Sequence, residues 1–263
     1  MNSEAIYLYC FARPGAASSL ATPGVGGDGR LFEARLGDAA AVVGRVPLGD
    51  FCGEAAESRL QDPDWIIPRA CQHERVIEEV MAHSPVLPAR FGAVFTSLQK
   101  VEELLRGKHE EIERFLDDAA DKEEWAVKGF LNAETACEWL MARDPGFAEQ
   151  AKGLADSPGA RYFQEKRLRA AAHERVKAWC RGAAEEVSLR LEEDAVAACP
   201  LRVRPEDSMV LHSAFLLRRS RVADFVARVE RLSRDRAERG LELVASGPWP
   251  LYSFCPGIGG AVA

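Results

Sequence analysis

The chain has 263 residues, of which 47% are hydrophobic and 29% are charged, and its formal net charge is −7. This balance is typical of a globular protein with a sizeable core and excludes a disordered or membrane-spanning chain. The length favours two domains. The negative charge argues against non-specific binding of nucleic acid, because neutralising phosphates needs a basic surface.

The first residues predict a cytoplasmic protein that begins with a strand. Residues 1–13 contain neither the basic segment nor the long apolar run of a signal peptide. Strands are expected at 6–11, 31–36 and 41–46, where β-branched and aromatic residues are frequent. The loop at 14–30 is rich in Gly, Ala, Ser and Pro, and we expect it to be mobile and exposed.

A helix is expected next, from about residue 69 to 83. Its apolar positions recur at i, i+3, i+4 and i+7, which is the spacing of one helix face. Proline cannot continue a helix, so the two prolines that follow predict an extended course over 85–95. Helical, charged sequence returns at 97–122. The residues on the apolar face of the first helix are His73, Val76, Ile77 and Val80.

The second half has the element order βαββαβ. A strand at 125–130 precedes helical sequence from about residue 134 and a long helix at 162–191. Two strands too close together for a crossover should then pair antiparallel. A helix with Ser220 as candidate N-cap and Gly240 as its stop leads to a last strand. The two close strands are at 197–203 and 209–217, the helix is at 220–239, and the last strand starts at 241.

These elements predict an α+β fold in two domains. Residues 1–122 form an N-terminal α+β domain, and residues 123–263 form a modified ferredoxin-like two-layer sandwich with a long helix and a closing tail. Many regulatory, binding and catalytic proteins use such sandwiches, so the architecture by itself names no function.

No catalytic, cofactor or metal site is predicted. The sequence Gly24 to Gly29 fits GxGxxG, but a loop precedes it and a strand follows, whereas a dinucleotide site needs a preceding strand and a following helix. His73, His109 and His173 each precede a glutamate without the second histidine of a zinc helix. GxSxG and P-loop motifs do not occur.

The cysteines and the uneven charge have ordinary interpretations. Seven cysteines without a CxxC pair predict free thiols that pack as small hydrophobes. Acidic residues dominate 102–124, whereas 218–239 is rich in arginine. We interpret both as solvated helix faces. The alternative is a charge-complementary contact between domains or between copies of the chain.

Two local features are candidates for function. His73 lies on an apolar face, and Arg90 lies between Leu87 and Phe91 in the proline-containing extended stretch. A buried arginine needs paired acceptors, so we interpret the two as a structural network in which Arg90 meets a carboxylate. A recognition or catalytic pocket is the alternative.

The second feature is 247–254, where two prolines stiffen a segment with three aromatic residues, including Trp249 and Tyr252. Stiff aromatic segments can anchor a partner because they lose little entropy on contact. The alternative is that this segment closes the core or a domain interface.

The chain resembles the gas vesicle protein family GvpL/GvpF along nearly its whole length. Cys10, Ala93 and Leu251 depart from the family pattern, and they leave the F-like and L-like subtypes both open. The matching stretches, in order, are 7–9, Asp64-Trp65-Ile66 ahead of His73, 85–92, 124–128, 159–163 and 247–254.

The resemblance implies an accessory or minor structural protein of gas vesicles, which is not an enzyme. Its implied partners are the small hydrophobic shell protein and other accessory proteins, with self-association possible, and its implied location is the cytoplasm and the gas vesicle. Candidate interaction residues combine the family motifs with the aromatic segment: His73, Arg90, Phe91, Trp249 and Tyr252. The alternative function is a small-ligand sensor or an enzyme built on the ferredoxin-like half, with His73 and Arg90 in its pocket.

Overall fold

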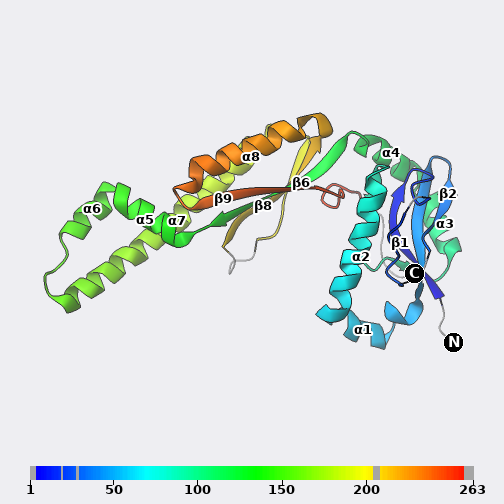
Figure 1. The fold of residues 1–263 in the computed structure, drawn as a ribbon, viewed down its shortest axis with the longest axis horizontal. Helices are drawn as coiled ribbons and strands as arrows, with labels where there is room; N and C mark the ends of the chain where they lie inside the picture. The colour runs from blue at the N-terminus through cyan, green and yellow to red at the C-terminus, as the bar shows by residue number, and fades with distance from the viewer. Residues whose placement is uncertain (1–3, 19, 28–29, 204–207, 258–263) are drawn as a thin grey trace. The chain divides into compact units, whose positions relative to one another are not determined.

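The computed structural model describes residues 4–18, 20–27, 30–203 and 208–257 (Figure 1). The chain divides into two compact units. The first unit comprises Met1–Glu123 together with Trp249–Ala263, and the second comprises Glu124–Pro248. The sequence placed the closing tail with the second domain, whereas here it is grouped with the first unit, where Tyr252 contacts Glu74.

The sheet of the first unit has the order β2-β3-β1-β4, and β5 also pairs with β1. All of these pairings are antiparallel. β1 is buried from its second residue onward, since both faces of the sheet are covered. The strands are β1 (Glu4–Ala12), β2 (Phe32–Leu36), β3 (Ala39–Pro47), β4 (Val86–Pro88) and β5 (Val94–Phe95).

Helices cover the two faces of this sheet. Tyr7 and Tyr9 of β1 pack in one cluster with α2, and Ile6 and Leu8 pack in another with α3 and α4 (Figure 1). A bulge between Leu8 and Cys10 shifts the register, so Tyr9 and Cys10 join the same cluster. The helices are α1 (Glu54–Leu60), α2 (Pro63–Met81), α3 (Leu98–Gly107) and α4 (His109–Ala119), and a short 3-10 turn is at Leu48–Asp50.

Two helix boundaries differ from expectation. α2 starts six residues before 69, because the Asp62 carboxylate caps it by accepting from the Asp64 N–H and Pro63 occupies its first turn. The helix continues through Pro68. The helix expected over 97–122 is broken at Lys108, whose φ of −118° and ψ of 13° are not helical.

The loop between β1 and β2 is not simply exposed, as we expected it to be. Val25 is 7% exposed, and its N–H donates to the Tyr9 hydroxyl at 2.8 Å. The Glu33 carboxylate accepts from two loop amides, and the Glu79 carboxylate accepts from two more. Most of the described loop residues are exposed, as predicted, but Ala16, Gly24 and Val25 are buried, because buried side chains and carboxylates bind the loop backbone.

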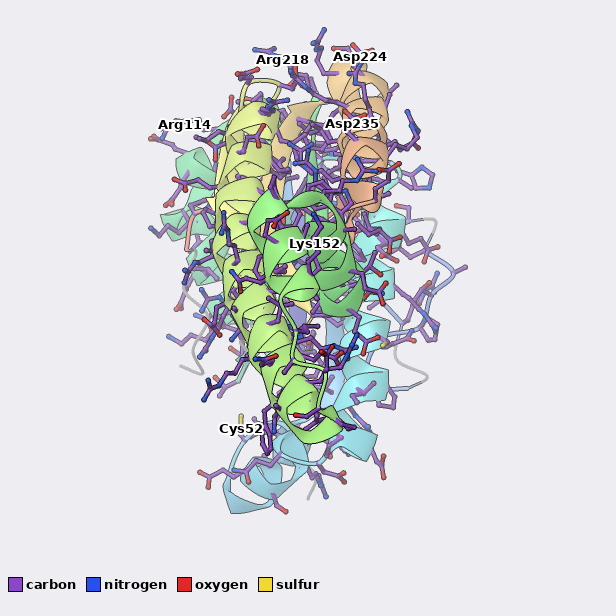
Figure 2. All side chains as sticks on the ribbon, turned by 90° about the vertical axis from the view of Figure 1, so that its left-hand side faces the viewer. Cys52, Arg114, Lys152, Arg218, Asp224 and Asp235 are labelled. Carbon is purple, nitrogen blue, oxygen red and sulfur yellow. The ribbon has the colours of Figure 1, made fainter. Side chains whose placement is uncertain are left out.

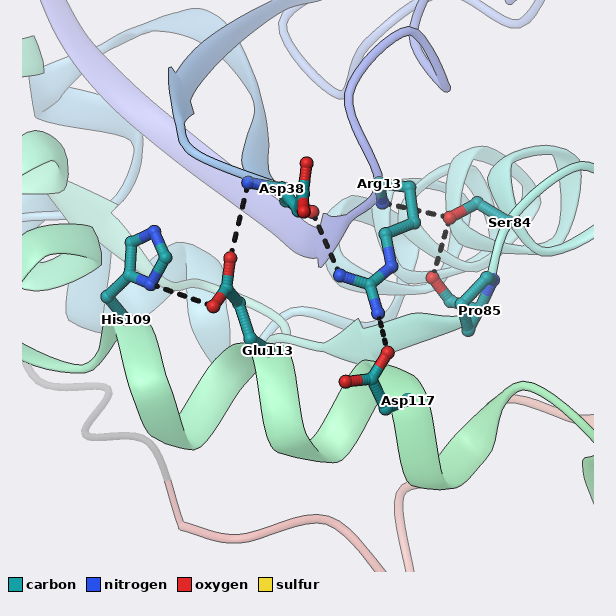
Figure 3. Close-up of polar contacts among 7 residues, drawn as sticks. All are labelled: Arg13, Asp38, Ser84, Pro85, His109, Glu113 and Asp117. Atoms are coloured by element: carbon teal, nitrogen blue, oxygen red, sulfur yellow. Dashed lines mark hydrogen bonds and ion pairs between the residues drawn. The ribbon is translucent and has the colours of Figure 1, made fainter.

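Polar contacts join α4 to the turn between β2 and β3 (Figure 3). The Glu113 carboxylate accepts from the Asp38 N–H at 3.2 Å and lies 3.3 Å from His109 Nδ1. The Arg13 guanidinium donates to the Asp38 carbonyl at 3.1 Å and pairs with Asp117. Part of the acidic segment that the sequence shows at 102–124 therefore has internal partners.

The second unit has a four-stranded sheet in the order β7-β8-β6-β9. β7 and β8 pair antiparallel, as predicted. Helices separate β6 from β7 and β8 from β9, so the connectivity is the predicted βαββαβ; the ferredoxin-like label stays a prediction. The strands are β6 (Lys122–Leu131), β7 (Ala197–Pro200), β8 (Met209–Arg218) and β9 (Leu241–Trp249).

One helix, α7, packs in two clusters. Its C-terminal half packs with α8 on the sheet, whereas its N-terminal half extends away from the sheet and packs on α5 and α6 (Figure 1). Figure 2 views the chain with this end toward the reader, with Lys152 of α6 in front. The helices are α5 (Ala133–Arg143), α6 (Pro145–Lys152), α7 (Pro158–Glu192) and α8 (Val222–Ala237).

Much of the arginine-rich segment pairs within the second unit. Arg228 pairs with Asp194 and lies 3.4 Å from Glu193, and Arg236 lies 3.3 Å from Glu186. α8 has no side-chain cap from Ser220, because a 3-10 turn at Arg219–Arg221 precedes it. The predicted cap at Ser220 is therefore wrong.

Within the described residues, no helix has the length and apolar character needed to cross a membrane. The same residues hold no group of three or more His, Cys, Asp or Glu side chains placed to bind a metal ion. All seven cysteines are free thiols.

Candidate functional site

The predicted site residues His73, Phe91 and Tyr252 come together in the first unit. His73 is 2% exposed on α2, and Tyr7 faces it from β1. Phe91 lies in the connection between β4 and β5, and Tyr252 reaches the same place from the tail. Segments distant in the sequence therefore converge on one imidazole.

A chain of hydrogen bonds fixes the protonation of His73. The Gly92 N–H donates to the Tyr7 hydroxyl at 3.0 Å, and that hydroxyl lies 3.0 Å from His73 Nδ1. His73 Nε2 lies 3.2 Å from the Ala89 carbonyl, which can only accept. Nε2 therefore carries the proton, and Nδ1 accepts from Tyr7. Both ring nitrogens of a neutral imidazole are thus occupied.

Aromatic rings enclose the imidazole. The Tyr9 ring stacks on it with centroids 5.7 Å apart and an interplanar angle of 23°. The Phe91 ring meets it edge to face at 5.8 Å, and Phe91 also contacts Phe51 at 6.2 Å. Edge-to-face and offset arrangements are the favourable ones for such rings. The cluster is therefore a packed part of the core.

The tail is attached through a carboxylate. The Tyr252 hydroxyl donates to Glu74 Oε2 at 2.9 Å and lies 3.5 Å from His73 Nε2. Burial, together with the charge of Glu74, raises the pKa of Tyr252, so the phenol stays protonated and keeps donating. Burial also raises the pKa of Glu74, and the hydrogen bond from Tyr252 opposes that shift.

Burial also shifts the pKa values of the three rings at the centre of the cluster. It lowers the pKa of His73 to about 4, while the hydrogen bond to Ala89 acts in the opposite direction. It raises the pKa of Tyr9 to about 12 and raises the pKa of Tyr7. At neutral pH all three rings are uncharged, as a desolvated site requires.

This arrangement suits structure more than acid–base chemistry. A general base needs a nitrogen or oxygen that can reach a substrate, and both nitrogens of His73 are bonded to protein groups. What the cluster does is hold α2, β1, the β4–β5 connection and the tail to one another. The geometry therefore agrees with the structural interpretation of His73.

The prediction that Arg90 is buried and paired with a carboxylate is wrong. Its side chain is exposed, and it forms no ion pair with any residue that the structure describes. The backbone turns here, since the Ala93 N–H donates to the Arg90 carbonyl at 3.2 Å. Trp249 is also exposed, at 39%, where the tail begins. Arg90 and Trp249 are therefore surface residues, in contrast to His73 and Phe91.

The sequence reasoning missed Tyr7, Tyr9 and Glu74. Alternate positions of a strand share a face, so Tyr7 and Tyr9 could have been paired from their spacing, and the bulge leaves both in one cluster. Nothing in the sequence pairs Glu74 with Tyr252, because 178 positions separate them.

Replacing Tyr252 with phenylalanine should loosen the tail while leaving the rest of the first unit folded. The change removes the donor to Glu74 and leaves a half-buried carboxylate without it, at a cost of about 1–3 kcal/mol. Amide hydrogen exchange at residues 250–257 should therefore speed up. Tyr162→Phe is the matched control, because Tyr162 is exposed in the second unit. Unchanged exchange in Tyr252→Phe would contradict this role of the hydroxyl.

The fold and the site define a two-unit α+β protein with a buried histidine and tyrosine cluster. Its sequence matches the gas vesicle synthesis protein GvpL/GvpF family over residues 5–256. The chain belongs to this family, so its role is related to gas vesicles.

Known gas vesicle proteins are similar to this chain in sequence. Gas vesicle protein L of Streptomyces sp. (strain CB03234) is 30% identical over 94% of this chain and 91% of its own length. Gas vesicle protein F of the same strain is 29% identical over 69% of this chain and 75% of its own length.

Two solved structures share the fold. The crystal structure of gas vesicle protein GvpF from Anabaena sp. PCC7120 has a TM-score of 0.69 at 16% identity, covering 97% of both chains. GvpF from Microcystis aeruginosa has a TM-score of 0.62 at 17% identity, covering 95% of this chain and 98% of that one. The mixed helix and sheet fold predicted from the sequence is thereby confirmed.

Proposed function

We propose that this protein is an accessory or minor structural protein that binds the small shell protein and other accessory proteins while gas vesicles assemble. It acts in the cytoplasm and at the vesicle, by binding and without catalysing a reaction. The observation that carries this proposal is the family match over residues 5–256.

The physical reason lies in the shell. A subunit that will face gas carries an apolar surface, and before assembly such a surface in water drives aggregation. A folded partner that covers this surface lowers that risk. Exposed aromatic side chains are suited to such contacts, because they bury a large area and lose few rotamers.

The tail offers one such surface. Trp249 is 39% exposed and Tyr252 is 37% exposed, although the Tyr252 hydroxyl is held by Glu74. The hydrogen bond to Glu74 therefore holds the Tyr252 ring in a defined position while part of that ring stays exposed. Such preorganisation favours binding because less entropy is lost on contact.

The test is capture of gas vesicle proteins on the tagged protein, compared with capture on the tag alone. We expect the small shell protein and other accessory proteins to be retained, and Trp249→Ala to retain less of them. Leu189→Ala is the control, because its side chain is 59% exposed and lies in the second unit. If soluble gas vesicle proteins are not retained by the unaltered protein, the proposal is wrong. If Trp249→Ala and Leu189→Ala reduce capture equally, the tail is not the binding surface.

A further inference from the structure

Two exposed apolar patches lie in different units. The first, which we call the arm patch, is at the start of α7, where Tyr162 is 59% exposed and Phe163 is 65% exposed. Their ring centroids are 5.6 Å apart in an edge-to-face arrangement. Two adjacent aromatic side chains this exposed are unusual for a helix whose opposite face is buried.

Cations surround the arm patch. Lys166 and Arg167 follow the two aromatics by one helical turn on the same face, which is opposite to the buried Leu168. Both cations are exposed, and neither is in an ion pair within the described part of the chain. The nearby Glu165 is already taken, since it accepts from Arg161 at 3.1 Å. The arm patch is therefore apolar and positively charged.

The second patch, which we call the corner patch, comprises residues at the end of α1 and in the first turns of α2. Leu60 is 36% exposed and Ile67 is 58% exposed. Ile67 is on the side of α2 opposite to His73 and Val80, so the core cannot cover it.

Anions surround the corner patch. Glu57, Asp62 and Asp64 are exposed, and no ion pair engages them among the described residues. The two arginines nearest to it in the sequence have partners in their own unit: Arg59 pairs with Asp50 at 2.6 Å, and Arg69 lies over the Trp65 ring at 4.2 Å. The corner patch is therefore apolar and negatively charged.

We propose that the arm patch of one copy of this chain binds the corner patch of a second copy. Each patch provides what the other lacks, an apolar centre with a rim of opposite charge, and contact would bury both centres while pairing the rims. Because the two patches differ, the contact is heterologous. Heterologous contacts repeat from copy to copy and give rings or open chains.

The contact should be weak and sensitive to salt, because exposed charges are screened beyond a Debye length of about 8 Å at physiological ionic strength. Sedimentation velocity across a wide protein concentration range should therefore show association at low ionic strength that high salt reverses. A monomer at every concentration in low salt would overturn the proposal.

Charge reversal identifies the surfaces. An arm variant, Lys166→Glu with Arg167→Glu, should stay monomeric, and so should a corner variant, Glu57→Lys with Asp64→Lys. A mixture of the two should associate again, because each retains one native patch and the reversed patches complement each other. The control is Arg114→Glu with Arg231→Glu. It changes the net charge by the same amount as the arm variant does, but at other exposed sites, so it should associate normally.

Each other outcome contradicts the proposal. Association that survives in the arm and corner variants would mean that other surfaces form the contact. A mixture that stays monomeric would mean that the two patches do not bind each other. Circular dichroism of each variant verifies the fold, and apolar variants at the same patches, Phe163→Ser and Ile67→Ser, should each weaken association without changing any charge.

Discussion

Replacing His73 with glutamine should make the stability of the first unit less dependent on pH. The pKa of His73 is about 4 in the folded protein, against an ordinary value of 6.5, because the ring is buried. Between these pH values the unfolded chain binds a proton that the folded chain does not. The free energy of unfolding therefore falls as the pH falls from 6.5 to 4, by about 3 kcal/mol from this group.

Above pH 6.5 the contribution of His73 is fully present, and below pH 4 it no longer changes. The chain has two compact units, so the measurement should be local, such as amide hydrogen exchange across α2. Glutamine can still donate to the Ala89 carbonyl, although its loss of ring contacts will lower stability at every pH. The informative quantity is therefore the difference in slope between the two proteins. Parallel pH profiles would contradict the assignment of a buried neutral imidazole.

Replacing Gly240 with alanine should destabilise the second unit by about 2–4 kcal/mol. Gly240 has a φ of +75°, a region that costs other residues about 1–2 kcal/mol. An added Cβ would also lie 2.5 Å from the Asn132 carbonyl oxygen, which is backbone and cannot rotate away. The Gly240 carbonyl accepts from the Asn132 N–H at 2.8 Å, so relief by moving the chain would strain that bond.

Gly182 supplies the matched control. It lies within α7, and an added Cβ there would meet nothing within 4 Å. Gly182→Ala should therefore stabilise the helix by about 0.5–1 kcal/mol, since glycine loses more backbone entropy than alanine. Amide hydrogen exchange across α7 and α8 in increasing urea would compare the two. Similar effects of the two alanines would rule out the steric argument at Gly240.

Local chemistry determined much of this fold. The i, i+3, i+4, i+7 pattern places His73, Val76, Ile77 and Val80 on one face, and all four are buried in α2. Gly240 was expected to stop α8, and it follows α8 with a positive φ. The βαββαβ order could be predicted as well. Such features depend on neighbours in the sequence, so periodicity and end residues specify them.

Tertiary contacts decided the rest. Arg90 was expected to be buried, yet its side chain is exposed, because the chain turns between β4 and β5 and the Ala93 N–H donates to the Arg90 carbonyl there. The loop residue Val25 is buried in the core cluster that contains Tyr9, and the Tyr9 hydroxyl accepts from its N–H.

The sequence by itself determined the family, the element order and the buried face that carries His73. Only the tertiary structure decided what surrounds that imidazole. Tyr7 and Tyr252 meet it from positions 66 and 179 residues away, and no local pattern encodes contacts at such separations. The physical reason is that a side chain's periodicity fixes the side of an element on which it lies, whereas its partner depends on how the elements pack.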